Sequence, residues 1–231
     1  MICLRGVTKT YEMGRFQPVA ALRSIDLDID RGEFVVITGR SGAGKTALLN
    51  VMAGLAKPTS GSVTIDGVDL SCLSDRQLSL LRNRTMGFVF QFPSLLASLS
   101  VLHNVMLPAS LTSESGGDCR ERAYELLATV GLRDRLTSHP RQLSAGQQQR
   151  VVIARALINR PEILLADEPS SDLDEETEAG IMTLFGRIHA ETGVTIALVT
   201  HAKELVAYGT RHVVMASGEL AAGIPAREPQ D

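Results

Sequence analysis

The chain is poor in aromatic residues and cysteine and has no excess of positive charge. Aromatic side chains make up 4% of its 231 residues, and tryptophan is absent. Its 23 Lys and Arg residues against 26 Asp and Glu residues give a formal net charge of -3, which argues against sequence-independent nucleic-acid binding. The cysteines, Cys3, Cys72 and Cys119, are widely spaced and fit neither a metal-binding nor a disulfide pattern, as in a reducing compartment.

Long hydrophobic runs are also missing. No apolar run approaches the roughly 18 residues that a membrane span requires. The first residues show no charged segment followed by an apolar one, so no signal peptide is visible. We therefore expect a soluble chain, large enough for one domain, and any membrane spans that it works with must come from another chain.

Apolar runs of strand length alternate with helical patterns, which predicts a single α/β domain over residues 1–231. Residues 25–30 alternate apolar and acidic side chains, so we expect a strand with one wet face in an antiparallel layer. Residues 33–38 and 163–166 are mostly apolar on both faces, as buried central strands are.

The middle of the chain departs from this alternation. Residues 92–160 are helical in character and are expected to form a subdomain inserted into the α/β core. Within it, residues 112–117 are expected to be a flexible link. Residues 223–231 are polar and contain two prolines, which predicts a loose tail.

Residues 39–46, Gly-Arg-Ser-Gly-Ala-Gly-Lys-Thr, have the P-loop pattern between an apolar strand and a helix. The glycines allow successive backbone N–H groups to converge on phosphate oxygens, and the helix adds the positive end of its dipole. Lys45 supplies a mobile charge for the β- and γ-phosphates, and the Thr46 hydroxyl suits Mg²⁺. A chance glycine-rich turn is the alternative, and the strand–loop–helix context favours the P-loop.

An acidic pair ends the apolar run 163–166. Asp167 is placed to hold the Mg²⁺ shell, and Glu168, one residue further, can polarise an attacking water as a general base. The alternative is an acidic turn that merely closes the strand.

Residues 143–150, Leu-Ser-Ala-Gly-Gln-Gln-Gln-Arg, precede another helical run. Ser144 is a good N-cap, and the free amides of Ala145 and Gly146 at the helix start would make a second anion site. A well-capped structural helix is the alternative.

This segment resembles the signature of ATP-binding cassette ATPases, and other elements match the same family in order. Gln91 resembles its Q-loop glutamine, residues 171–174 its D-loop, His201 its switch histidine, and Tyr11 the aromatic residue that stacks on adenine. Taken singly, such a glutamine, histidine or tyrosine is more often structural. Together with the P-loop, these ordered motifs span most of the chain.

The resemblance implies a P-loop NTPase core of mostly parallel sheet flanked by helices, an N-terminal antiparallel β layer and an inserted helical subdomain. It implies an ATPase that uses Mg²⁺ and dimerises head to tail, with ATP between the P-loop of one copy and the signature of the other. The implied nucleotide-binding residues are Tyr11, Gly39, Ser41, Gly42, Ala43, Gly44, Lys45, Thr46 and Ala47. The implied signature contacts across the dimer are Ser144, Ala145, Gly146 and Gln147. Gln91, Glu168 and His201 would be catalytic, Thr46, Gln91 and Asp167 would hold Mg²⁺, and Asp174 would connect the two sites.

Three positions depart from the family pattern. Ala47 lacks the hydroxyl that usually follows the P-loop threonine, and Ser171-Asp172 varies the D-loop. Ala145 replaces the first signature glycine, which would cost about 1 kcal/mol if the position needs a positive φ. None of these removes a catalytic group, so we expect an active ATPase.

Within the family, the chain looks most like the ATPase subunits of lipoprotein-release, macrolide-export and cell-division permeases. The matching stretches include 82–91 and 101–105. The resemblance implies a permease partner bound through Phe92–Val105, a peripheral location on the inner face of the membrane, and no direct nucleic-acid contact. An importer subunit and, less favoured, a non-transport cassette acting on nucleic acid or ribosomes stay open as alternatives.

Overall fold

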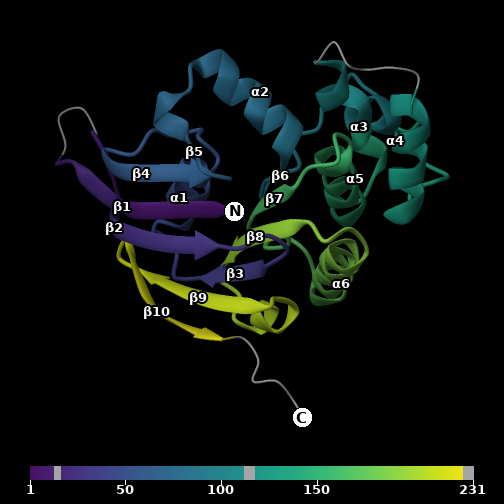
Figure 1. Cartoon of the computed structure of the whole chain (residues 1–231). Coiled ribbons are helices and arrows are strands. Elements are labelled where there is room, and N and C mark those ends of the chain that lie inside the picture. Colours follow the sequence, from purple (N-terminus) through teal and green to yellow (C-terminus); the bar gives the residue numbers. More distant parts are fainter. Residues whose placement is uncertain (13–16, 112–117, 226–231) are drawn as a thin grey trace.

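Strands and helices alternate along the chain in a computed structural model that describes residues 1–12, 17–111 and 118–225 (Figure 1). The strands are β1 (Ile2–Tyr11), β2 (Val19–Ile29), β3 (Phe34–Thr38), β4 (Ser60–Ile65), β5 (Val68–Asp69), β6 (Met86–Val89), β7 (Ile163–Asp167), β8 (Thr195–Thr200), β9 (Arg211–Ala216) and β10 (Glu219–Pro225). The helices are α1 (Lys45–Met52), α2 (Asp75–Thr85), α3 (Val101–Ser110), α4 (Asp118–Thr129), α5 (Ala145–Leu157) and α6 (Glu175–Thr192). Short 3-10 turns are η1 (Leu70–Cys72), η2 (Pro140–Gln142) and η3 (Glu204–Tyr208).

The larger sheet has the order β10-β9-β3-β8-β7-β6, and all its neighbouring pairs are parallel except β10 with β9. Its central strands β3 and β8 are buried along their whole length, as their apolar runs predict. The side chains of β3 alternate between two cores. Val35 and Ile37 face one of them, and Phe34 and Val36 face the other.

The smaller sheet is antiparallel, with the order β2-β1-β4-β5. In β2, Ile25, Leu27 and Ile29 are buried while Asp26 and Asp28 are exposed, so the predicted wet-faced strand is confirmed. This sheet, helix α1 and one face of the larger sheet enclose the first hydrophobic core. The strand layer therefore lies beside the segment that follows β3.

Helices α3, α4, α5 and α6 enclose the second core against the other face of the larger sheet. Figure 1 shows α3, α4 and α5 gathered on one side of the molecule, away from β1 and β2. All three lie inside the range 92–160 that the sequence marks as helical. The link expected at residues 112–117 lies outside the described residues.

The C-terminal boundary needs a correction. The sequence predicts a loose tail from Gly223, but β10 continues to Pro225 and pairs with β9, with Pro225 opposite Arg211. A proline is compatible with this position because β10 is an edge strand, where one side needs no ladder donor. Residues 226–231 lie outside the described part of the chain.

Candidate nucleotide site

The P-loop joins β3 to α1 and is closely enclosed by two other strands. A Cβ atom on Gly39 would lie 2.4 Å from the carbonyl oxygen of Met215 in β9. A Cβ on Gly44, whose φ is 104°, would lie 2.3 Å from the carbonyl oxygen of Ala21 in β2. Contacts with the protein itself therefore require glycine at both ends of the loop, whether or not a ligand is bound.

The remaining loop residues differ in exposure. Ser41 and Gly42 are exposed, as an approach to a ligand requires, whereas Ala43 is buried and donates its N–H to the Arg40 carbonyl oxygen at 3.0 Å. Ala47 is also buried in α1, so a hydroxyl there would not face open solvent. The exposed part of the loop, Ser41 and Gly42, thus lies just before the N-terminus of α1.

Lys45 begins α1 and is buried, with 6% of its surface exposed. Its Nζ donates to the carbonyl oxygens of Gly39 at 2.8 Å and Arg40 at 3.3 Å. It also forms an ion pair with Glu168 Oε1 at 3.2 Å. A buried ammonium group requires such partners, and here the loop carbonyls and one carboxylate supply them.

Asp167 ends β7 next to α1. The Thr46 hydroxyl donates to its Oδ1 at 3.2 Å. Burial raises the pKa of Asp167 above its ordinary value of 3.8, with the charge of Glu168 acting in the same direction and Thr46 and Lys45 opposing it. The structure thus brings together Thr46 and Asp167, two of the three residues, with Gln91, that the sequence predicts for Mg²⁺.

Glu168 has a left-handed backbone, with φ 47°. Its N–H donates to the Val199 carbonyl oxygen at 2.9 Å, which fixes the residue against β8. A non-glycine residue in this conformation costs on the order of 1 kcal/mol, and such strain is found at functional sites. The conformation places the Glu168 carboxylate between Lys45 and the end of β8.

His201 follows β8 and contacts that carboxylate twice. Its backbone N–H and its ring Nδ1 lie 3.2 and 2.9 Å from Glu168 Oε2. Because β3, β8 and β7 are neighbours in the sheet, their carboxyl ends bring Lys45, Glu168 and His201 into one contiguous group. Ligand sites in open α/β sheets lie at this edge.

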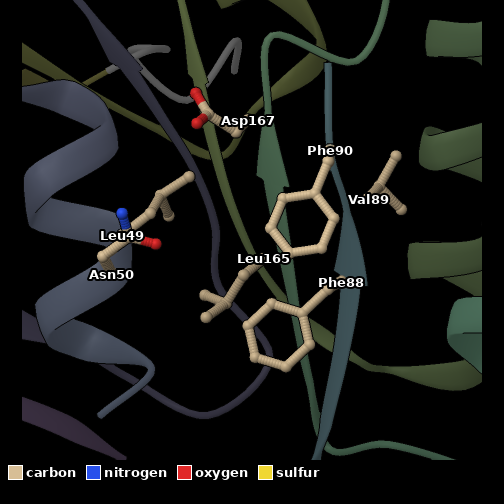
Figure 2. A pocket seen from close by; sticks show the side chains of 7 residues that line it. All are labelled: Leu49, Asn50, Phe88, Val89, Phe90, Leu165 and Asp167. Atoms are coloured by element: carbon tan, nitrogen blue, oxygen red, sulfur yellow. The ribbon is translucent and has the colours of Figure 1, made fainter. Parts of the chain in front are cut away.

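Gln91 follows β6 and is exposed, and its side chain makes no hydrogen bond to another described residue. It is therefore not joined to Thr46 or Asp167. Between α1 and strands β6 and β7, Figure 2 shows a pocket with Leu49 and Asn50 on one wall and the rings of Phe88 and Phe90 on the other. The two rings stack with centroids 5.8 Å apart.

The signature segment starts α5 with a capping box. Ser144 Oγ accepts from the Gln147 N–H at 3.3 Å, and Gln147 Oε1 accepts from the Ser144 N–H at 3.0 Å. Ala145 is the first helical residue, so the cost expected for a positive φ does not arise. The steric requirement falls on Gly146 instead, where a Cβ would lie 2.4 Å from Thr177 Cγ2 of α6.

Asp174 caps the neighbouring helix α6. Its carboxylate oxygens accept from the backbone N–H of Thr177 at 2.9 Å and from the Thr177 hydroxyl at 2.8 Å. The backbone hydrogen bond, then the hydroxyl, lowers the pKa of Asp174. Thr177 thus links the signature and D-loop segments, a role that the sequence prediction missed although Asp-x-x-Thr is a recognisable cap pattern.

The predicted site residues fall into two groups. The P-loop, Asp167, Glu168 and His201 form one, and the signature segment with Asp174 forms the other. The Ser171 hydroxyl, at the start of the D-loop, donates to the Glu168 carbonyl oxygen at 3.3 Å. Among the described residues, no hydrogen bond or ion pair joins Ser144–Gln147 or Asp174 to the first group. Tyr11 lies apart from both at the end of β1, 36% exposed, with Lys9 Nζ 5.0 Å from its ring centroid.

The strand–loop–helix unit around the P-loop and the acidic residues at the carboxyl edge of the parallel sheet define the class of a P-loop nucleoside triphosphatase. Comparison with known proteins places the chain within that class. Residues 22–171 match the family described as ABC transporter. The chain therefore belongs to the ABC transporter family and is an ATP-binding, ATP-hydrolysing cassette.

Similar proteins cover nearly the whole chain. The lipoprotein-releasing system ATP-binding protein LolD of Bacteroides thetaiotaomicron is 44% identical over 220 residues, which is 95% of this chain and 99% of LolD. The macrolide export ATP-binding/permease protein MacB of Syntrophobacter fumaroxidans is 47% identical over 203 residues, 87% of this chain but only 28% of MacB. A dimeric structure of the ATP-binding cassette MJ0796, in a post-hydrolysis state bound to ADP and Pi, matches with a TM-score of 0.90 and 42% identity. It covers 99% of this chain and 100% of that one, and the MJ0796 sequence is from Methanocaldococcus jannaschii.

No helix in the described ranges is long and apolar enough to cross a bilayer.

Proposed function

We propose that the chain hydrolyses ATP as one half of a head-to-tail pair. Each nucleotide would lie between the P-loop group of one copy and the Ser144–Gln147 turn of the other. The observation that carries this proposal is the separation of the two groups within one chain, although each contains the start of a helix suited to phosphate: α1 has no side-chain cap, and in α5 the cap binds the Gln147 N–H and not those of Ala145 and Gly146. The dimeric state of the similar cassette MJ0796 supports it.

The P-loop group would bind the triphosphate. Lys45 is held by Glu168 and two loop carbonyls, so phosphate oxygens would replace the carboxylate as its partner. The carboxylate of Glu168 would then be available to accept a proton from the attacking water. His201, bound to the other oxygen of Glu168, would keep the carboxylate oriented and face the γ-phosphate. Tyr11 would stack on adenine.

The residues present also suit Mg²⁺. Thr46 and Asp167 supply hard oxygen donors 3.2 Å apart beside the P-loop, and the exposed side chain of Gln91 supplies a third once it turns inward. When bound, the ion would neutralise charge that develops on the phosphate oxygens.

Glu168→Gln tests the catalytic role. The amide keeps the shape but cannot accept a proton, so ATP turnover should fall by at least about a hundredfold while ATP binding persists. The variant should also form a stable dimer in ATP, because the shared γ-phosphate is retained. Turnover is measured by phosphate release and dimerisation by size-exclusion chromatography. A matched control is Glu33→Gln, a half-buried glutamate paired with Arg211 outside the site. Near-normal hydrolysis by Glu168→Gln would exclude this residue as the base.

The partner surface is proposed to lie in the segment Phe92–Val105. Phe92 and Leu96 are 68% and 46% exposed, whereas Val101, Leu102 and Val105 belong to the helical core. An apolar surface of this kind suits a helix of another protein. We infer that the partner is a membrane permease of the lipoprotein-release or macrolide-export type, which would hold the chain at the inner face of the membrane.

A further inference from the structure

Tyr11, the residue proposed to stack on adenine, has a lysine against its ring. Lys9 Nζ lies 5.0 Å from the centroid of the Tyr11 ring, within the range of a cation–π contact. Within the described ranges Lys9 pairs with no carboxylate, and its ammonium group contacts the ring and one backbone carbonyl oxygen. The Tyr11 ring is therefore a principal partner of this positive charge.

The ammonium group of Lys9 is also tethered to a second segment. It donates to the carbonyl oxygen of Lys57 at 2.7 Å, in the turn that follows α1. The same turn is bound to β1 twice more: the Thr59 N–H donates to the Thr8 carbonyl oxygen at 2.7 Å, and the Thr59 hydroxyl accepts from the Thr10 N–H at 3.0 Å. Because a half-exposed lysine without such partners keeps most of its rotamer freedom, these contacts give Lys9 a defined position.

The Tyr11 ring lies beside an exposed apolar neighbour. Val19, directly opposite Tyr11 in the β1–β2 ladder, is 53% exposed, and Tyr11 is 36% exposed. Opposite residues in an antiparallel pair have their side chains on the same face. Two residues further along β2, the Ala21 carbonyl oxygen approaches Gly44 of the P-loop. Strand β2 therefore connects the loop that would bind the triphosphate with an exposed surface suited to a base.

A second cation–π pair in the protein shows a different arrangement. Arg120 lies with its guanidinium 5.6 Å from the centroid of the Tyr124 ring, one turn away on the same helix, α4. Its Nε also donates to the Tyr124 hydroxyl at 3.0 Å, so this pair stabilises one helix only. The Lys9 contact instead holds a ring on β1 from a turn 48 residues away in the sequence.

A cation on one side of an aromatic ring also affects what binds on the other side. It fixes the ring, and it draws π-electron density toward itself, which favours stacking of an electron-rich purine. The base of a bound nucleotide lies away from the phosphorus that reacts, so such stacking is equal in the ground state and in the transition state. Interactions of this kind lower KM and leave kcat unchanged.

We infer that Lys9 is a positioning residue for the nucleotide base: it holds the Tyr11 ring from one side so that adenine stacks on the other. This inference rests on the proposed function, in which Tyr11 stacks on adenine, and adds to it the residue that prepares the ring. Lys9 therefore contributes to ATP affinity and takes no part in the chemical step.

Phosphate-release kinetics of the full chain with Mg²⁺ and ATP test this role. Lys9→Met removes the charge and keeps the length of the side chain, so the KM for ATP should rise at least about fivefold while kcat stays within about twofold. Lys9→Arg keeps a cation that can lie over the ring and should restore most of the affinity. Lys9→Gln, which can still donate to the Lys57 carbonyl, should also raise KM and is a second variant should Lys9→Met fold poorly.

A ligand without a base separates stacking from attraction of the phosphates. Inorganic tripolyphosphate, measured by titration calorimetry, should bind Lys9→Met as tightly as the unaltered protein. The matched control is Lys57→Met, which removes an exposed charge from the same turn and keeps the carbonyl that binds Lys9, so its KM should be normal. An equal rise of KM in this control, or weaker tripolyphosphate binding by Lys9→Met, would show a general effect of charge and would overturn the inference.

Removal of the ring separates this inference from the role proposed for Tyr11. Tyr11→Leu should raise the KM for ATP, and Lys9→Met should then add less than about a further twofold, because its partner is gone. A full additional rise would overturn the inference, as would a normal KM in Lys9→Met beside a raised KM in Tyr11→Leu. A normal KM in Tyr11→Leu would contradict the stacking role of Tyr11 itself, and the inference with it.

Discussion

Single side chains set the charge balance of the nucleotide site. Lys45, Glu168 and His201 form a chain of contacts in which the carboxylate lies between an ammonium and an imidazole. Each group thereby satisfies another, so burial of Lys45 leaves no uncompensated charge. A triphosphate bound as proposed would therefore have to displace the Glu168 carboxylate from Lys45.

One histidine outside this group makes stability depend on pH. His212 in β9 lies with Nε2 2.8 Å from the hydroxyl of Thr38, the last residue before the P-loop. Burial lowers the pKa of His212 below its ordinary value of 6.5. Between the lowered pKa and 6.5 the unfolded chain therefore binds more protons than the folded one, so this contribution to stability is lost as pH falls through that window.

We expect the free energy of unfolding to decrease on acidification below about pH 6.5, because the folded ring takes up a proton less readily than the unfolded one. Urea unfolding at several pH values measures it. His212→Gln can still bond Thr38 but cannot titrate, so its profile should be flatter over that interval. An identical pH profile in both proteins would contradict the assignment.

At the scale of elements, two helices begin in the same way with different consequences. Ser74 caps α2 and Ser144 caps α5, each in a capping box with a glutamine three residues later. Only α5 presents its first turn beside Thr177 of α6. Comparing substitutions of Ser74 and Ser144 therefore separates the stability lost with a helix cap from the dimerisation lost with a nucleotide contact.

Ser74→Ala and Ser144→Ala should each destabilise the fold by about 1 kcal/mol, because each removes one capping hydrogen bond. In a Glu168→Gln background, only Ser144→Ala should raise the ATP concentration needed for dimerisation, on the order of tenfold. Denaturant unfolding and size-exclusion chromatography measure the two effects. Equal effects on dimerisation would show that Ser144 acts only as a cap.

At the scale of the whole molecule, complementary defects should restore one site. Lys45→Ala damages the P-loop group, and Ser144→Arg blocks the signature turn. A mixed dimer contains one composite site with both parts intact, so mixing two inactive variants should recover measurable ATPase activity. Heterodimer formation is monitored with two affinity tags. A heterodimer as inactive as its parents would contradict the head-to-tail arrangement.

A matched pair of substitutions can test whether the proposed permease surface acts specifically or whether any new surface charge weakens binding. Leu96 and Val68 are 46% and 45% exposed, but Val68 lies in the antiparallel layer. Leu96→Glu should leave nucleotide binding nearly intact and reduce co-purification with the permease at least about tenfold, because a carboxylate buried at an interface costs several kcal/mol. Val68→Glu should bind the permease normally. Normal capture by Leu96→Glu and by Phe92→Glu would place the contact elsewhere.

The sequence by itself determined the local features of this protein. Strand–loop–helix order, the Gly39–Thr46 pattern and the Ser144 cap depend on neighbouring residues only, so local pattern is enough to predict them. The family resemblance rested on the same local motifs, and the comparisons confirm it. The active-site roles of the individual residues stay predictions.

Only the tertiary structure decided which of these motifs meet. It joined Lys45 to Glu168 across 123 residues of chain because β3, β8 and β7 pair side by side, and sheet order is not written in any single strand. It moved the steric requirement from Ala145 to Gly146, because a helix from elsewhere in the chain lies against that position. The structure also shows that the start of the expected tail belongs to β10, which pairs with the edge of β9. Contacts of Arg155 with residues 61 and 62 places earlier follow from the packing of α5, which local pattern could not reveal.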